Sequence, residues 1–419
     1  MTRTGAVRHF VFGCIKIAVV GSRVYYIWLA SLFLLIAIGA WAYSRQLDEG
    51  LVVTALRDPV SWGFYIGNFT FLVGVAAAAV ILVIPAYIYH WKPIKEIVIL
   101  GELMAIAALA MCMLFVLVDM GRPDRLLHII PFIGSINLPS SLLGWDVVVL
   151  NLYFCLNLGV VTYLLWSIYR RREPNPYIFT PLVLFSIPVA VGIHTVTAFV
   201  YSGLPGRPFW NASILAPKFL ASAFCSGPAL MLILLQVLRK FFKLDLKIEA
   251  IWKIAELMAY AMFINLFFLF AEIFKEAYSD THHLQHLKYL YFGIEGHNAL
   301  IGWAWFSVVC SVAAFFLFLV PATRKNVITL NLGCVFIWCG VYIEKGIGLV
   351  VPGFTPSTLG EIYEYSPTMI EFMVAFGIFG VGALVFTFLS RVAIALTRGG
   401  FGLRMPLEPG APPGDAAGG

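Results

Sequence analysis

The 419-residue chain is 61% hydrophobic and only 12% charged, and its mean hydropathy is +0.90. Soluble chains carry about a quarter charged residues, so this composition excludes a soluble globular protein. The net charge of +6 is then no sign of nucleic-acid binding, because excess Lys and Arg in a membrane protein mark the loops that face the cytoplasm. We expect an all-α polytopic membrane protein.

Apolar runs bounded by charged or Pro/Gly-rich breaks predict ten transmembrane helices, since a spanning helix needs about 20 apolar residues. In chain order they cover 24–43, 60–89, 97–119, 143–168, 179–201, 213–238, 252–274, 297–320, 327–346 and 369–391. Of the 28 Lys and Arg residues, 19 fall on the side of the N-terminus and 9 on the other. The positive-inside rule therefore predicts an inner (cytoplasmic) membrane protein with both termini in the cytoplasm.

A short repeat divides the chain into two bundles. Gly101-Glu102-Leu103-Met104-Ala105 returns 154 residues later as Ala255-Glu256-Leu257-Met258-Ala259. This offset maps spans 2–5 onto spans 6–9 and, because four is even, predicts two four-helix bundles in parallel orientation. Shared composition alone is the alternative. The expected segments are 1–23, a cytoplasmic start with an interfacial helix; 24–59, the first span and an external loop; 60–201 and 202–346, the two bundles; 347–396, a loop and the last span; and 397–419, a disordered cytoplasmic tail.

The sequence lacks the usual ligand patterns for metals and haem. Its seven Cys residues lie mostly inside apolar spans and form no C-x-x-C pair, as zinc or iron–sulfur sites would need. A haem between helices needs paired His residues at matching depth, and only His194 lies well inside a span. His282 and His286 form an i,i+4 pair without a third ligand. We expect no haem, iron–sulfur cluster or metal on this chain.

Ionisable residues within the spans are the strongest functional signal, because a charge in hydrocarbon costs at least ~2.5–3.5 kcal/mol. Glu102 and Glu256 lie in the cytoplasmic half. Towards the external half lie Asp119, Asp146, His194, Glu272, Glu344 and Glu371. A merely interfacial role is the alternative for Asp146 and Glu371. Together these residues predict a polar pocket that opens to the outside, suited to a quinone headgroup that exchanges protons or to an ion pathway.

The external loops are long and carry unexpected charge. Arg122 and Arg125 lie beside Asp119 and Asp124, against the sign bias of that face, which indicates pairing. The segment is either a structured lid over the pocket or a surface salt-bridge cluster of little energetic value. The aromatic-rich segments 202–212, 275–296 and 347–368 suit the docking of a peripheral subunit.

Three stretches together resemble the NrfD/PsrC family of membrane quinone-reactive subunits. They are Trp62-Gly63-Phe64-Tyr65-Ile66-Gly67-Asn68-Phe69 with its continuation to Tyr89-His90-Trp91-Lys92-Pro93-Ile94-Lys95-Glu96; Asp119-Met120-Gly121-Arg122-Pro123-Asp124-Arg125; and Pro139-Ser140-Ser141-Leu142-Leu143-Gly144-Trp145-Asp146. The resemblance is strongest over 55–165. Within the family, the segments 90–97 and 119–125 look most like the DsrP branch, which is associated with dissimilatory sulfite reductase.

The resemblance implies a subunit without its own redox cofactor that binds menaquinone or another quinone near the external, periplasmic face. It also implies electron exchange with a docked periplasmic ferredoxin-like iron–sulfur subunit. The implied complex holds a haem-b membrane subunit, a c-type cytochrome subunit and a cytoplasmic iron–sulfur subunit as well. Some relatives carry a His in the second span where this chain has Ala77, so their proton route does not carry over directly.

The leading hypothesis is a quinone-binding, electron-transferring subunit that is not catalytic alone. His194 is the chosen hydrogen-bond partner of a quinone carbonyl, because a His can donate a proton and be reprotonated near neutral pH. The other candidates are Asn68, Tyr65 and Tyr201 in the pocket, Asp119 and Arg122 at its rim, and Glu102, Glu256 and Glu272 on a proton path. The rival is a proton-coupled secondary transporter, which repeated bundles with intramembrane carboxylates also fit.

Overall fold

The computed structural model describes residues 3–399 except 78, 89–90, 92–93, 95–96, 131, 243–246 and 281. Its helices are α1 (Arg3–Val19), α2 (Arg23–Glu49), α3 (Phe64–Ala77), α4 (Val80–Val83), α6 (Val98–Asp119), α7 (Leu142–Tyr169), α8 (Pro176–Ser202), α9 (Leu215–Phe242), α10 (Ile248–Ser279), α11 (His282–Tyr291), α12 (Ile301–Leu319), α13 (Pro321–Lys325), α14 (Val327–Lys345), α15 (Ile347–Val350) and α16 (Met369–Thr397). Short 3-10 turns are η1 (Leu51–Val53), η3 (Pro123–Ile129), η4 (Pro208–Trp210) and η5 (Val351–Gly353), and η2 (Ile84–Ile88) is a π-helix.

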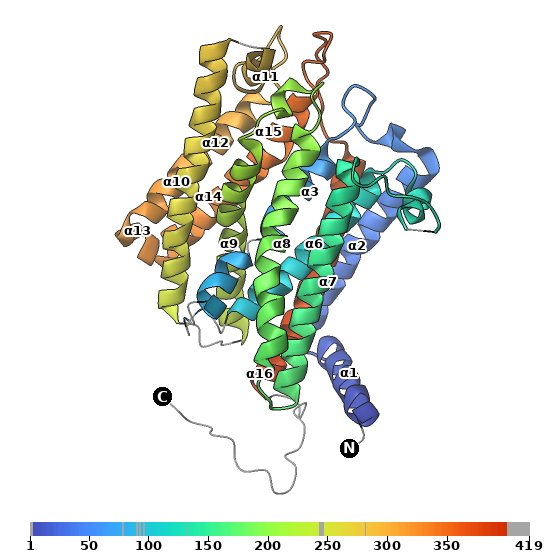
Figure 1. The fold of residues 1–419 in the computed structure, drawn as a ribbon, viewed down its shortest axis with the longest axis vertical. Helices are drawn as coiled ribbons and strands as arrows, with labels where there is room; N and C mark the ends of the chain where they lie inside the picture. The colour runs from blue at the N-terminus through green and yellow to red at the C-terminus, as the bar shows by residue number, and fades with distance from the viewer. Residues whose placement is uncertain are drawn as a thin grey trace, which may run out of the picture.

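The long helices run side by side, with α1 and the start of the chain at one end of the bundle (Figure 1). The end of α16 lies at this same end, whereas α11 and α15 lie at the opposite one. We call the opposite end, which holds α11 and α15, the loop end. The helices α3, α9 and α16 begin there, and α8 and α14 end there.

Within the described residues, nine helical segments are long and apolar enough to cross a membrane. They involve α2, α6, α7, α8, α9, α10, α12, α14 and α16, so the predicted all-α polytopic fold is confirmed. The expected span 60–89 has a different form, because α3 ends at Ala77 and is followed by α4 and the π-helical η2. Residues 400–419, most of the predicted tail, lie outside the described residues.

Side-chain caps define several helix starts. The Ser141 hydroxyl accepts a 3.0 Å hydrogen bond from the Gly144 amide ahead of α7, and the Asn175 side chain accepts one of 3.0 Å from the Tyr177 amide ahead of α8. Thr368 and Glu371 form a capping box at the start of α16. These bonds satisfy amide groups that the first helical turn leaves without an intrahelical partner, which is why the chain turns into a helix at these points.

The helices pack as two sets of four with matching neighbours. In the first set α3 packs on α6, α6 on α7, α7 on α8 and α8 on α3; in the second set α9, α10, α12 and α14 follow the same order. The sets meet where α3 and α8 pack on α9 and where α3 packs on α14. The helix α16 lies against α2 and α6 outside this core. That the two sets arose from a repeat stays a prediction.

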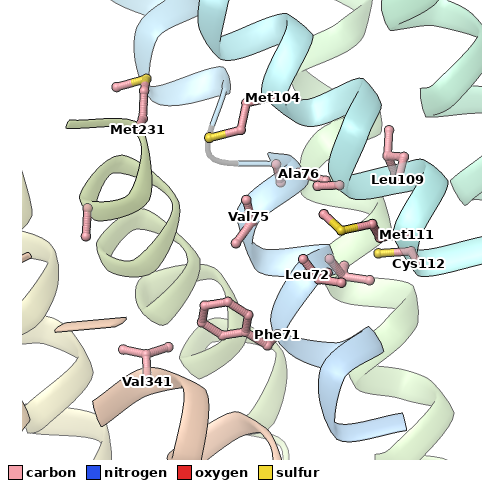
Figure 2. Close-up of a cluster of buried hydrophobic side chains, with 14 of the residues drawn as sticks. Phe71, Leu72, Val75, Ala76, Met104, Leu109, Met111, Cys112, Met231 and Val341 are labelled. Carbon is pink, nitrogen blue, oxygen red and sulfur yellow. The ribbon is translucent and has the colours of Figure 1, made fainter. Parts of the chain in front are cut away.

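The helix α3 is buried along nearly its whole length, from Tyr65 to Ala77. Figure 2 shows its Phe71, Leu72, Val75 and Ala76 among Met104, Leu109, Met111 and Cys112 of α6, Met231 of α9 and Val341 of α14. Gly67 permits a close approach to the end of α14, since a Cβ at this position would lie 3.2 Å from the Cα of Gly346. Polar side chains on α3 are therefore held in the interior, between the two sets.

Candidate functional site

Buried and partly buried polar side chains gather in the half of the bundle nearer the loop end. They come from α3, α7, α8, α9 and α14. The set comprises Tyr65, Asn68 and Thr70 on α3, Asp146 on α7, His194, Thr197 and Tyr201 on α8, Lys218, Ser222 and Ser226 on α9, and Glu344 and Lys345 on α14. We call this set the polar band. Because helices of both sets contribute to it, the band spans the junction between them.

Three of the predicted pocket residues on α3 and α8 are buried in hydrogen-bonded pairs. The Asn68 amide oxygen accepts a 2.7 Å bond from the Tyr342 hydroxyl, and its nitrogen donates to the Phe64 carbonyl at 2.8 Å. The Tyr65 hydroxyl donates to the Gln46 side chain on α2 at 2.8 Å. The hydroxyls of Tyr201 and Thr70 lie 2.5 Å apart. Each pair ties a residue named from the sequence to a partner that the sequence did not reveal.

His194 differs from these neighbours. Its side chain is 1% exposed, and within the described part of the chain neither ring nitrogen forms a hydrogen bond of normal geometry. Thr197 and Tyr201 follow it at spacings of three and seven, which place all three on one face of α8. The Thr197 hydroxyl donates to the Asp146 carboxylate at 2.7 Å. The imidazole therefore lies in a polar interior, beside the backbone of Ala190 on its own helix and without a side-chain hydrogen bond among the described residues.

Aromatic rings close this interior at the loop end. Trp62 stacks on Trp210 with 5.6 Å between centroids, and Trp210 meets Tyr201 at 5.1 Å and Phe354 at 4.9 Å. The Trp210 indole also donates to the Leu349 carbonyl at 2.8 Å. The ring is so tightly enclosed that a Cβ at Gly353 would lie 1.9 Å from it. The sequence showed aromatic-rich loops here without revealing that they form this cover.

The two predicted rim residues lie in different surroundings. Asp119, the last residue of α6, has one carboxylate oxygen that is buried without a hydrogen bond among the described residues. Arg122 points outward, with 66% of its side chain exposed, and pairs with Asp124 at 2.9 Å. Hydrogen bonds from Arg122 lower the pKa of the Asp124 carboxyl below its ordinary value. An exposed pair of this kind contributes little stability, as the surface alternative anticipated.

Glu371 is a buried structural hub near this rim. Its carboxylate accepts from the amides of Ala55 at 2.9 Å and Thr368 at 2.8 Å, and from the Tyr365 hydroxyl. The same hydroxyl accepts a 2.8 Å bond from the Phe64 amide at the start of α3. Burial raises the pKa of Tyr365 above its ordinary value, so its hydroxyl stays protonated and donates to Glu371 well above neutral pH. Glu371 thereby anchors α16 to the start of α3.

A second ionic group lies inside the second set. The Lys218 ammonium is 2.7 Å from Glu272 and 3.3 Å from Glu344, and Asn265 donates to Glu344 at 3.1 Å. We call Lys218, Glu272 and Glu344 the ion cluster. It borders a cavity of about 40 Å³, which also touches Ser311, whose hydroxyl has no hydrogen-bond partner in the described chain. A water needs roughly 10–15 Å³, so the cavity has room for a few waters but not for a quinone ring.

Lys345 is the buried cation at the junction of the sets. It is 3% exposed, donates to the Phe219 carbonyl at 2.9 Å and lies 4.8 Å from the centroid of the Phe219 ring. Sequence reading missed Lys345 and Lys218, because a lysine within a few residues of a predicted span end looks interfacial. The one signal in the sequence was that both lysines are among the 9 Lys and Arg residues assigned to the external face, where few cations are expected.

The three proton-path candidates occupy three different environments. Glu102 is 3% exposed, and one of its oxygens has no hydrogen-bond partner among the residues described. Glu256 is 26% exposed and pairs with Lys253 at 3.3 Å and Arg324 at 3.8 Å. The two side chains differ in exposure because α4 packs over α6 near Glu102, whereas Glu256 lies on the side of α10 that faces α13 and the outside. Glu272 belongs to the ion cluster. The structure brings none of the three together.

A profile of the family described as polysulphide reductase, NrfD, matches residues 52–355. This stretch runs from η1 past η5 and contains both four-helix sets, while α2 and α16 lie outside it. In the described residues, no group of three or more His, Cys, Asp or Glu side chains is arranged to hold a metal ion.

Three curated relatives align over most of both chains. The membrane subunit of a candidate dimethyl sulfoxide reductase of Halobacterium salinarum is 27% identical over 404 residues, which are 85% of this chain and 88% of the relative. The Hdr-like menaquinol oxidoreductase integral membrane subunit of Archaeoglobus fulgidus is 22% identical, over 84% and 88%. The integral membrane subunit of menaquinone reductase of Nitratidesulfovibrio vulgaris is 23% identical, over 85% and 88%.

Proposed function

The chain belongs to the NrfD family, and from this premise we propose that it is the quinone-interacting membrane subunit of a multi-subunit redox complex. Two relatives are named as integral membrane subunits of a menaquinol oxidoreductase and a menaquinone reductase, which supports menaquinone as the substrate. The chain then works with partner subunits that carry the electrons and is not an enzyme by itself.

The observation that carries the proposal is the buried imidazole of His194, which forms no hydrogen bond of normal geometry among the described residues. A buried polar group without a hydrogen bond costs about 1–3 kcal/mol, so such a group points to a partner that binds there. A quinone has two carbonyl oxygens that accept hydrogen bonds. The imidazole donates to one of them and, after reduction, supplies a proton and is reprotonated. Asn68, Tyr65 and Tyr201 frame the headgroup, with Asp119 and Arg122 at the rim.

Reduction of the quinone to quinol takes two electrons and two protons. We assign the electrons to a periplasmic ferredoxin-like iron–sulfur subunit docked on the loop end, where the aromatic-rich segments 202–212 and 347–368 lie. This assignment makes the loop end periplasmic and both termini cytoplasmic. The other proposed partners are a haem-b membrane subunit, a c-type cytochrome subunit and a cytoplasmic iron–sulfur subunit. The proposed complex is that of the DsrP branch and of sulfur metabolism.

The protons have a proposed source inside the bundle. Glu102 is buried in the half nearer the termini, and its unpaired oxygen suits a carboxyl that takes up and passes on a proton. Glu272 and Glu256 are the further candidates for proton transfer. With uptake from the cytoplasmic side, quinone reduction at the loop end moves charge across the membrane.

The test replaces His194 in the assembled complex. His194→Ala and His194→Asn are compared with the native chain for binding of a fluorescent quinone-site inhibitor and for reduction of a soluble menaquinone analogue. The matched control is Thr195→Val, because among the described residues the Thr195 hydroxyl bonds only to the Val191 carbonyl of its own helix. We expect inhibitor affinity to fall at least tenfold in both His194 variants and to be unchanged in the control. Native affinity in both His194 variants contradicts the proposal.

A further inference from the structure

The ion cluster of Lys218, Glu272 and Glu344 combines two carboxylates with a single ammonium. The Lys218 ammonium lies 2.7 Å from Glu272 and 3.3 Å from Glu344, and among the described residues no second cation lies within ion-pair distance of either carboxylate. All three side chains are only 13% exposed, so water screens their charges weakly. A buried charge without a counter-charge is costly. The cluster therefore lacks one unit of positive charge.

Three oxygen atoms in and around the ion cluster are buried without a hydrogen bond from any described residue. They are Oε1 of Glu344, Oδ1 of Asn265 and Oγ of Ser311. Asn265 is 0% exposed and Ser311 is 2% exposed, so bulk water does not reach them. Buried polar atoms in native proteins nearly always have a partner. These oxygens therefore point to a bound partner in addition to Lys218.

The three oxygens come from three helices that meet at Glu344. The Asn265 amide nitrogen on α10 donates to Oε2 of Glu344 at 3.1 Å, so this amide is held against the carboxylate. The Ser311 hydroxyl on α12 lies against α14 one turn before Glu344, because a Cβ on Gly340 would be 2.5 Å from its oxygen. Ser311 and the whole ion cluster line the same cavity of about 40 Å³. Carboxylate, amide and hydroxyl oxygens thus gather beside one small space.

A water molecule and a cation would satisfy this site differently. Water fills the lone pairs but leaves the net negative charge in place. A monovalent cation does both, whereas a divalent cation would leave one positive charge in excess. Carboxylate, carbonyl and hydroxyl oxygens are the ligands that hard cations prefer. The cavity has room for a small ion with a water or two, which favours sodium over the larger potassium ion.

We propose that the ion cluster, together with Asn265 and Ser311, binds one sodium ion. The ion joins α10, α12 and α14 through their oxygens and balances the charge that Lys218 leaves uncompensated. Leu287 and Tyr291 of α11 line the same cavity, so the ion enters from the loop end. The expectation of a chain without metal rested on His and Cys patterns, which sodium does not require.

The first test measures binding of radioactive sodium to the intact complex by equilibrium dialysis, in choline chloride at constant ionic strength. Ser311→Ala removes one oxygen and no charge, and we expect at least a tenfold loss of affinity. Glu272→Gln leaves Lys218 and Glu344 as a neutral pair, so we expect one fewer bound sodium ion per chain. The matched control is Ser390→Ala, because Ser390 is also 2% exposed and its hydroxyl bonds to the Thr387 carbonyl of its own helix.

The second test needs no variant. A ligand that binds only the folded state raises the melting temperature as its concentration rises. We expect sodium chloride to raise the melting temperature of the native complex more than potassium or choline chloride at the same ionic strength. Equal melting temperatures in the three salts overturn the inference, as does sodium binding that is unchanged in both Ser311→Ala and Glu272→Gln.

The inference goes beyond the proposed quinone function and fails separately from it. No quinone takes part in either test, and His194 is not among the residues of the sodium site. We expect the His194→Ala complex to bind sodium with native affinity, whatever its activity with a menaquinone analogue. Loss of sodium binding in His194→Ala, with native binding in Ser311→Ala, would place the ion elsewhere and contradict the inference.

Discussion

The Tyr342 hydroxyl donates a 2.7 Å hydrogen bond to the Asn68 amide oxygen and so ties α14 of the second set to α3 of the first. Because the Asn68 nitrogen is bonded to the Phe64 carbonyl, both ends of the amide are held and its orientation is fixed. Lys345 follows Tyr342 by three residues, on the same side of α14. The face of α14 that orients Asn68 therefore also carries the buried cation.

Tyr342→Phe leaves the buried Asn68 oxygen without its donor. We expect a loss of about 1 kcal/mol of stability, seen as a fall of a few degrees in the melting temperature of the purified complex. Tyr260→Phe is the control, since the Tyr260 hydroxyl bonds to the partly exposed Glu256. Equal melting temperatures for native chain and Tyr342→Phe contradict the structural role of the bond.

Lys218→Met removes the cation between the carboxylates of Glu272 and Glu344, whose side chains are only 13% exposed. Breaking a buried pair from one side costs about 3–5 kcal/mol, because the remaining charge is left without compensation. We expect a lower melting temperature or loss of assembly, and partial recovery in Lys218→Met with Glu272→Gln, where one stranded charge is gone. Thermal unfolding followed by tryptophan fluorescence measures both. A double variant no more stable than the single one argues against the ion cluster as drawn.

Tyr365→Phe removes the hydroxyl that connects the Phe64 amide to Glu371. Two buried partners lose a hydrogen bond, and the expected loss is about 1–3 kcal/mol. Tyr363→Phe is a matched control two residues away, because its hydroxyl bonds to the exposed Glu361. Chemical denaturation should separate the two variants; identical midpoints would mean that Glu371 does not anchor α16 in this way.

Glu102→Gln keeps the shape of a buried carboxyl and removes its proton exchange. In reconstituted vesicles we expect quinone reduction to continue with proton uptake from the lumen or medium reduced at least severalfold. Glu249→Gln, at an exposed carboxyl in the first turn of α10, is the comparison and should leave uptake at the native level. Unchanged proton uptake in the Glu102→Gln variant would show that Glu102 is not part of the proposed proton path.

The hydrophobic pattern and composition of the sequence were sufficient to predict the helices. They predicted much less of the candidate site. Runs of apolar residues located the long helices, because a bilayer demands a minimum helix length. The break after Ala77 was missed, since its apolar sequence continues unchanged. The sequence singled out His194 as a deep ionisable residue. It did not reveal that Tyr342 bonds to Asn68 or that Lys345 lies beside α3, because contacts between α14 and α3 depend on how two helix sets meet.

Isolation of the tagged chain in mild detergent tests the assembly. We expect an iron–sulfur protein and cytochromes to co-purify in fixed ratio and to be identified by mass spectrometry. Recovery of the chain alone, with retained transport of an ion or solute in vesicles, would instead favour a proton-coupled transporter.

The most direct measurement of the central claim is photolabelling of the intact complex with an azido-menaquinone, followed by mapping of the labelled peptides. We expect label on α8 around His194 and on α3 around Asn68, and we expect excess menaquinone to reduce this labelling. Label confined to the outward faces of α10 and α12, unaffected by competitor, would contradict a quinone site in the polar band.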